Sequence, residues 1–229
     1  MKKKTIITFL LSLLALIGTQ AKENADGQPS SAANDGKAKL IAQAELPEGA
    51  VFDGDFLSCT TWTDKLGTNY LVTSQTQWRK REPEDLEVLL CDKEIFAYHY
   101  VAQGGSLKRL WKLLDFIHDC ELGAPMLDYL HTLFITDADW DGICETWLIY
   151  RVDCIGDGGP LGTKLIMHIG EKKYAIRGEA DYWTETSVKN LGSPPVPDAA
   201  YKTLPQRVQD TGMVIWYRYQ TWNFGTEEY

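Results

Sequence analysis

An acidic stretch near the middle of the chain carries the clearest signal for chemistry. It reads Asp-Ala-Asp-Trp-Asp-Gly-Ile-Cys-Glu from Asp137 to Glu145. Carboxylates occupy positions 1, 3, 5 and 9 of this loop, and a glycine occupies position 6. Loops with this spacing wrap oxygen ligands around Ca²⁺, and the glycine allows the sharp turn that brings the later ligands round. The sequence therefore predicts a calcium site.

The predicted ligands are three aspartate side chains, one backbone carbonyl and one glutamate. They are Asp137, Asp139, Asp141, the carbonyl oxygen of Ile143, and Glu145 either directly or through water. A solvated acidic turn is the alternative, because Asp and Gly are common in turns. Close carboxylates repel one another, however, and a bound cation relieves that repulsion. We expect the ion to stabilise the fold, and we predict no catalytic residue.

This stretch is not a complete EF-hand loop. Its twelfth position is Leu148, where an EF-hand has a bidentate Glu. The stretch resembles instead the short D-x-D-x-D-G-x-x-[DE] calcium loops of FG-GAP and integrin-type β-propeller repeats, which join two strands. The segment after it fits that interpretation, because residues 146–152 alternate between two faces as a strand does.

The first residues are typical of a secretory signal peptide. Lys2 to Lys4 form a basic region, residues 5–18 are apolar, and small residues precede Lys22, so we expect residues 1–21 to be cleaved. An uncleaved anchor is the alternative, but the apolar run is short for a membrane span. No cysteine precedes Cys59, so a lipid-anchored start is not encoded. We expect a periplasmic or extracellular protein with no membrane insertion after cleavage.

Composition narrows the class of partner. The formal net charge is -9, which disfavours nucleic acid and anionic membranes. A hydrophobic content of 44% is enough for a packed core. Residues 22–45 are mostly small and polar and are predicted to be a flexible spacer. Residues 46–229 are predicted to form a single β-rich domain with a C-terminal extension after about residue 190.

Turn residues separate segments rich in β-branched and aromatic side chains, which indicates consecutive antiparallel hairpins. The predicted strands are 56–62, 69–76, 86–91, 95–101, 126–136, 146–152, 164–169 and 173–177, with turns at 64–67, 92–94, 103–106 and 170–172. Residues 107–117 have apolar side chains at helical spacing, but the preceding Gly104-Gly105 turn favours a strand.

A peripheral helix is expected near the C-terminus. Residues 206–222 read as a short amphipathic helix that packs onto the sheet through Val208, Met213, Trp216 and Tyr217. The predicted fold class is therefore mainly β: a single domain of consecutive antiparallel hairpins with a C-terminal helix. An α+β arrangement is the alternative.

The cysteine count is odd, so at least one of the five thiols is unpaired. If 107–117, 126–136 and 146–152 form an antiparallel meander, Cys120 and Cys154 emerge at the same end, and we predict a disulfide between them. Cys59 and Cys91 lie in strand-like segments and are expected to be buried or paired with each other.

Several motifs together resemble a family of exported bacterial proteins, some of them labelled surface polysaccharide biosynthesis proteins. The matching segments are residues 62–69, 135–145, the Cys154-x-Gly156-Asp157 turn, 164–167 and 173–178. In the family the cysteine turn carries an Arg and a Ser where this chain has Ile155 and Gly159. The resemblance implies an exported location and a link to surface glycans, and it names no reaction.

These features predict an exported, calcium-stabilised, non-enzymatic binding or accessory protein of the bacterial cell envelope. Its expected partner is a surface glycan or another envelope protein. The alternative is an enzyme or accessory factor that acts on surface polysaccharide. Two carboxylates about 5–9.5 Å apart, in a pocket lined by exposed Trp or Tyr, would favour that alternative.

Overall fold

A computed structural model describes residues 38–83, 88–121, 125–129, 133–154, 160–183, 189–190 and 192–223. The predicted signal peptide (1–21) and the predicted spacer up to residue 37 lie outside these residues. Antiparallel sheets make up most of what is described, with one α-helix near the C-terminus, so the predicted mainly β fold is confirmed.

The first sheet has six strands in the order β1-β2-β3-β5-β4, with β6 paired to the other side of β5. Their bounds are β1 Lys39–Ile41, β2 Asp55–Asp64, β3 Gly67–Gln75, β4 Arg79–Arg81, β5 Leu90–Gln103 and β6 Ser106–Cys120. The tight β5–β6 hairpin is closed by Gly104 and Gly105, both at positive φ, which suits the two-residue hairpin turns that glycine favours.

The second sheet has the order β14-β11-β10-β9-β7, with β8 also paired to β9. Its strands are β7 Pro125–Tyr129, β8 Phe134–Thr136, β9 Glu145–Cys154, β10 Gly162–Ile169, β11 Lys172–Glu179 and β14 Val196–Pro197. A small third sheet pairs β12 (Asp181–Trp183) with β13 (Lys189–Asn190) and, in parallel, with β15 (Thr221–Asn223).

The two large sheets pack face to face. The core between them takes Trp62, Leu71 and Ile95 from the first sheet and Leu148 and Ile166 from the second. Strand alternation produces this arrangement, because every second side chain points into the interface. Aromatic rings extend the same core: Trp62 stacks on His99 of β5, and Trp111 of β6 stacks on His168 of β10 with ring centroids 3.9 Å apart.

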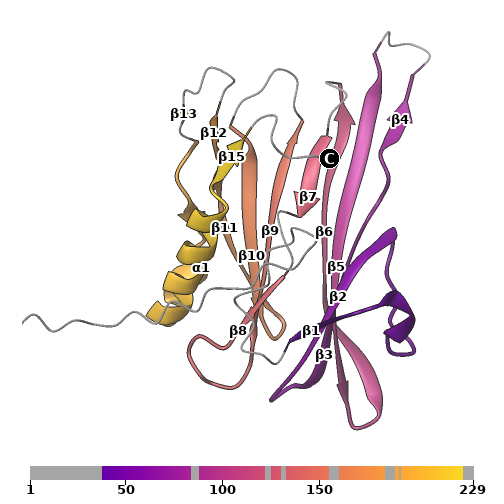
Figure 1. Ribbon diagram of the computed structural model, residues 1–229, viewed down its shortest axis with the longest axis vertical. Coiled ribbons are helices and arrows are strands. Elements are labelled where there is room, and N and C mark those ends of the chain that lie inside the picture. Colours follow the sequence, from indigo (N-terminus) through magenta and orange to yellow (C-terminus); the bar gives the residue numbers. More distant parts are fainter. Residues whose placement is uncertain are drawn as a thin grey trace, which may run out of the picture. The chain divides into compact units, whose positions relative to one another are not determined.

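The helix α1 (Gln206–Arg218) covers the other face of the second sheet, as Figure 1 shows. Val208 and Trp216 are buried and Met213 is partly buried, as predicted, but Tyr217 is 58% exposed, so its predicted packing is wrong. Gly212 allows the close approach, because a Cβ there would lie 2.1 Å from the hydroxyl oxygen of Tyr201 and 2.7 Å from the Trp147 ring.

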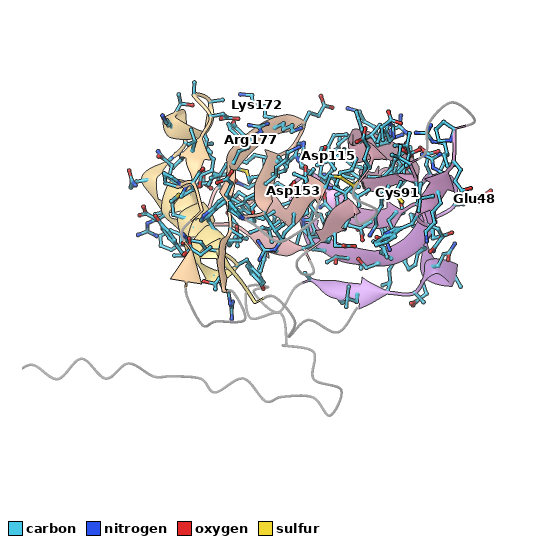
Figure 2. The ribbon with its side chains drawn as sticks, turned by 90° about the horizontal axis from the view of Figure 1, so that it is seen from above. Glu48, Cys91, Asp115, Asp153, Lys172 and Arg177 are labelled. Carbon is cyan, nitrogen blue, oxygen red and sulfur yellow. A yellow bond between two sulfur atoms is a disulfide. The ribbon has the colours of Figure 1, made fainter. Side chains whose placement is uncertain are left out.

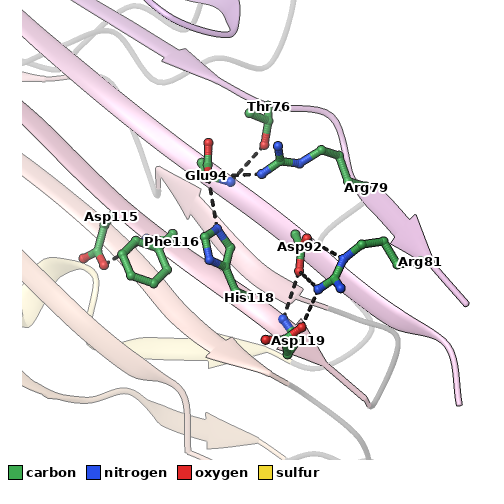
Figure 3. A network of polar contacts seen from close by, with 9 residues as sticks. All are labelled: Thr76, Arg79, Arg81, Asp92, Glu94, Asp115, Phe116, His118 and Asp119. Atoms are coloured by element: carbon green, nitrogen blue, oxygen red, sulfur yellow. Dashed lines mark hydrogen bonds and ion pairs between the residues drawn. The ribbon is translucent and has the colours of Figure 1, made fainter. Parts of the chain in front are cut away.

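Strand β5 corrects the predicted hairpin of 86–91 and 95–101, because β5 continues through the predicted turn at 92–94. Each charged residue of that segment has a partner from elsewhere in the chain. Asp92 binds Arg81, Glu94 binds Arg79 and His118, and Lys93 binds Asp128 (Figure 3 shows the first two groups). Paired charges no longer favour a solvated turn, so the strand extends.

Three further boundaries differ from or refine the prediction. Residues 107–117 are strand, as favoured. Residues 126–136 are divided between β7 and β8, which both pair with β9. Residues 39–45 belong to the fold and not to a spacer, because β1 pairs with β2 and a short 3₁₀ helix follows at Gln43–Glu45.

Candidate metal centre

The acidic stretch forms a loop between β8 and β9, whose last and first residues, Thr136 and Glu145, are register partners. Hydrogen bonds from its own backbone wind the loop tightly. The N–H of Gly142 donates to Asp137 Oδ1 (3.2 Å), and the N–H of Asp141 donates to Asp139 Oδ1 (3.2 Å). Asp side chains favour such local turns, so the sequence itself specifies this winding.

Two residues of the loop adopt positive φ. Gly142 has φ 83°, as expected for glycine at position 6. Trp140 has φ 60°, which is unusual for a bulky residue and costs about 1–3 kcal/mol. Conformations of this kind persist where surrounding contacts hold them, and they cluster at ligand sites.

The three predicted aspartates come together. Asp137, Asp139 and Asp141 each offer a carboxylate oxygen, and these oxygens all lie within 4.8 Å of one another. Ligands of one Ca²⁺ ion, each at about 2.3–2.6 Å from the metal, must lie within about 5 Å of each other. The described loop therefore gathers a set of oxygens that could hold a metal ion.

The other two predicted ligands are not part of this group of clustered oxygens. Ile143 is half-buried, and its N–H donates to Asp141 Oδ1 (2.7 Å). Glu145 is 1% exposed, and its Oε2 accepts hydrogen bonds from Thr136 Oγ1 (2.6 Å) and from the N–H of Ala138 (3.0 Å). Its Oε1 is buried and has no hydrogen-bond partner among the described residues.

Burial raises the pKa of Glu145 above its ordinary value, and the negative charge of Asp139 acts in the same direction. Hydrogen bonds from Thr136 and Ala138 oppose the shift. A buried carboxylate of this kind is costly when it is charged and incompletely paired. A cation near the loop would favour the ionised form.

The turn between β2 and β3 holds the loop from the side of the first sheet. The N–H of Lys65 donates to the carbonyl oxygen of Gly142 (2.9 Å), and Lys65 Nζ donates to the carbonyl oxygen of Asp141. Asp64 Oδ2 accepts a hydrogen bond from the N–H of Cys144 (3.1 Å). The loop therefore connects the two sheets at one end of the sandwich.

Helix α1 reaches the loop from the other side. The guanidinium carbon of Arg207 lies 3.9 Å from the ring centroid of Trp140, a cation–π contact. Trp140 is otherwise 73% exposed. The loop sequence predicts neither Arg207 nor Lys65 as a neighbour, because both come from distant parts of the chain. The segment containing Lys65 did, however, belong to the motifs that carried the family resemblance.

The predicted disulfide is present and joins Cys120 of β6 to Cys154 of β9, with Cα atoms 5.6 Å apart. The two strands lie in different sheets, so the bond crosses the sandwich and does not link neighbours in a meander. Cys59 and Cys91 are both buried, and each is a free thiol. Of the two predicted alternatives, burial of both cysteines is therefore correct, and a disulfide between them is not formed.

A second group of acidic side chains lies where β4, β5 and β6 meet (Figure 3). Asp92 accepts hydrogen bonds from Arg81 and from the N–H of Asp119, which hold its pKa below the ordinary value. Glu94 is paired with Arg79 and His118. A general acid needs a raised pKa, so Asp92 is suited to a structural role. The ion pairs of Glu94 join β5 to β4 and β6.

A cavity of about 260 Å³ lies beside β1, β2 and β3. Its lining includes Lys39, Glu45, Thr61, Thr68 and Tyr70, and Glu45 is the one carboxylate among the lining residues that the structure describes. Trp62 also lines it but is 2% exposed. The described lining therefore does not supply the pair of carboxylates that glycoside hydrolysis uses.

Within the described ranges, no helix is long and apolar enough to cross a membrane. Comparisons with protein-family models, with curated proteins and with solved structures found no match.

Proposed function

We propose that the loop from Asp137 to Glu145 binds Ca²⁺ and that the ion stabilises an exported binding or accessory protein of the cell envelope. The observation that carries the proposal is the convergence of three aspartate carboxylates within 4.8 Å. The carbonyl oxygen of Ile143 and the carboxylate of Glu145 would complete the ligand set. The partnerless buried oxygen of Glu145 supports this assignment, because a cation would compensate its burial.

The role of the ion would be structural. The loop contacts the β2–β3 turn through Lys65 and contacts α1 through Trp140. Fixing the loop would therefore fix the relative positions of both sheets and the helix at this end. The described neighbours of the loop include no paired acid and base that would suggest a reaction.

Calorimetric titration of CaCl₂ into EDTA-treated protein tests the metal assignment. We expect one site with Kd of about 10⁻⁴–10⁻³ M, the range of extracellular calcium modules. Asp139→Ala should abolish the heat, because it removes one of the three clustered carboxylate ligands. Glu48→Ala removes an exposed carboxylate outside the loop and should leave binding unchanged. Equal binding by the Asp139→Ala protein would overturn the assignment.

The cellular role follows from the compartment. A disulfide forms and persists in oxidising compartments, which supports an exported location. The resemblance to surface polysaccharide proteins supports a surface glycan or another envelope protein as the partner. An enzyme acting on surface polysaccharide is the second candidate, and the cavity beside β1 does not favour it.

A glycan array separates these roles when it is read with calcium and with chelator. An accessory protein should bind without releasing product, and calcium-dependent release of oligosaccharide would instead establish the enzyme.

A further inference from the structure

Strand β6 is an open edge of the first sheet. It is 15 residues long, and among the described strands it pairs only with β5. Edge strands expose unpaired N–H and C=O groups, and proteins usually protect them with short length, proline, bulges or charged side chains. Two charged residues of the middle stretch of β6 are already paired, Lys112 with Asp53 and Asp115 with Lys164. The stretch from Trp111 to Ile117 contains no proline, and its register with β5 is unbroken.

The outward face of this edge carries two exposed apolar side chains between Lys112 and His118. Leu114 is 49% exposed and Phe116 is 51% exposed. The two alternate with Leu113 and Asp115, which face the second sheet, so both belong to one outward stripe. Exposed apolar side chains on an open edge strand suit pairing with another chain.

The inward face of β6 lies against β10 of the second sheet. Lys164 Nζ of β10 binds Asp115 Oδ2 (2.6 Å), and His168 of β10 stacks on Trp111. In the β10–β11 register, Lys164 is the partner of Arg177 and His168 is the partner of Lys173. The segment from Lys173 to Arg177 therefore lies one strand beyond β10, at the level of the segment of β6 from Trp111 to Asp115.

Lys173 and Arg177 are exposed, and neither has an ion pair or side-chain hydrogen bond with a described residue. They share one face of β11, because they are four residues apart in a strand. Ala175, which lies between them on the same face, packs in the core between the two sheets, so both cations lie on the face of β11 that is turned toward the first sheet. Figure 2 labels Arg177 and Asp115 on the two sheets.

We propose that β6 binds an extended acidic peptide of a partner protein as an added strand. The peptide backbone would pair with β6 between Trp111 and Ile117, and its carboxylates would bind Lys173 and Arg177. These two residues are about 13 Å apart along the strand, so carboxylates four residues apart in the peptide match them. The chain carries a formal net charge of -9, so an acidic peptide needs a local group of cations such as Lys173 and Arg177 to bind.

A second copy of this chain fits the edge less well. Its own β6 would bring another Lys112 and another pair of unpaired cations, so like charges would meet. An acidic polysaccharide would satisfy the cations but has no strand backbone to pair with β6. Both occupants are distinguishable by experiment.

Fluorescence anisotropy tests the proposal with the full mature chain. The probe is a fluorescein-labelled peptide with two repeats of Glu-Val-Thr-Val, which places Glu residues four apart on one face. The controls are the same peptide with Lys for Glu and a version with alternate backbone nitrogens methylated. We expect the acidic peptide to bind and both controls to bind at least tenfold more weakly, because each removes charge-assisted or strand hydrogen bonds worth about tenfold or more.

The protein variants assign the site. Lys173→Gln with Arg177→Gln should weaken binding by about tenfold or more, and higher salt should weaken it further. Lys172→Gln is the matched control, because Lys172 neighbours Lys173 but strand alternation places its side chain on the opposite face of β11. Hydrogen exchange of the amides from Trp111 to Ile117 should slow when the peptide is bound.

Four results would overturn the proposal. They are no binding of the acidic peptide, equal binding of the methylated peptide, binding unaffected by the double substitution, and unchanged exchange of β6. Displacement of the peptide by polygalacturonate without protection of β6 would instead assign the cations to an acidic glycan. A dimer in solution that protects β6 without peptide would assign the edge to a second copy.

Discussion

Calcium is expected to raise the unfolding temperature of the protein by an amount that the loop geometry sets. Three carboxylates within 4.8 Å form three repulsive pairs. Each pair costs about 1 kcal/mol at the dielectric constant of water, so a bound cation removes about 3 kcal/mol of repulsion. Mass action gives a similar value: 10 mM calcium and Kd of about 10⁻⁴–10⁻³ M stabilise the folded state by about 1.4–2.7 kcal/mol.

For a chain of this size, each kcal/mol shifts Tm by about 2–4 °C. We therefore expect a rise of about 3–10 °C between EDTA and 10 mM CaCl₂, measured by differential scanning calorimetry. MgCl₂ at the same concentration should give a smaller rise, because Mg²⁺ demands a stricter octahedral geometry. Asp139→Ala should remove the calcium effect, and Glu48→Ala should preserve it. The same Tm in EDTA and in calcium for the unsubstituted protein would refute the reasoning.

Three further predictions concern stability. Replacing both Cys120 and Cys154 by serine should lower the free energy of unfolding in urea by about 2–4 kcal/mol, and an unchanged urea midpoint would show that the bond does not constrain the chain. Burial lowers the pKa of His99 to about 4 and that of His168 to about 3, so the folded state excludes protons that the unfolded state binds below about pH 6.5. Their contribution to the free energy of unfolding is complete above that pH and is lost as the pH falls toward 4. The NMR signals of both rings should remain those of neutral imidazole down to pH 5. Titration of either ring near pH 6.5 would contradict its burial. Gly212→Ala should destabilise the protein by about 1–3 kcal/mol in thermal unfolding, because the added methyl group overlaps the buried side chains of Tyr201 and Trp147. This loss should exceed the gain from the higher helix propensity of alanine. A higher Tm of the variant would contradict the close packing.

Local turn chemistry explains which parts of the fold were predictable. The hairpin turns at 64–67, 103–106 and 170–172 are encoded by glycine and polar residues next to strand-forming segments, and all three are present. The turn predicted at 92–94 is absent because Asp92, Lys93 and Glu94 are neutralised by partners from other strands. Pairing over that distance leaves no periodic signal in the sequence.

Local sequence patterns also could not predict which of the two sheets each strand joins. Cys120 and Cys154 were correctly paired, but a meander was the expected reason, and the structure places β6 and β9 in opposite sheets. The spacing of the two cysteines in the sequence is the same whether their strands lie in one meander or in the two opposite sheets of a sandwich. Alternation of side chains identifies a strand but not the sheet to which it belongs.

The candidate site divides in the same way. The spacing of Asp137, Asp139 and Asp141 is local, and it correctly predicted that their carboxylates gather. The contacts of Lys65 and Arg207 with the loop depend on packing of the β2–β3 turn and of α1, which no short motif records.

Terbium luminescence tests the central claim most directly. Tb³⁺ occupies calcium sites through the same oxygen ligands, and Trp140 at loop position 4 would transfer excitation energy to it. On excitation of tryptophan, we expect Tb³⁺ emission that saturates with one site, that falls when Ca²⁺ is added, and that is lost in Asp139→Ala. A flat titration of the intact protein would contradict the assignment of the Asp137–Glu145 loop as a calcium site.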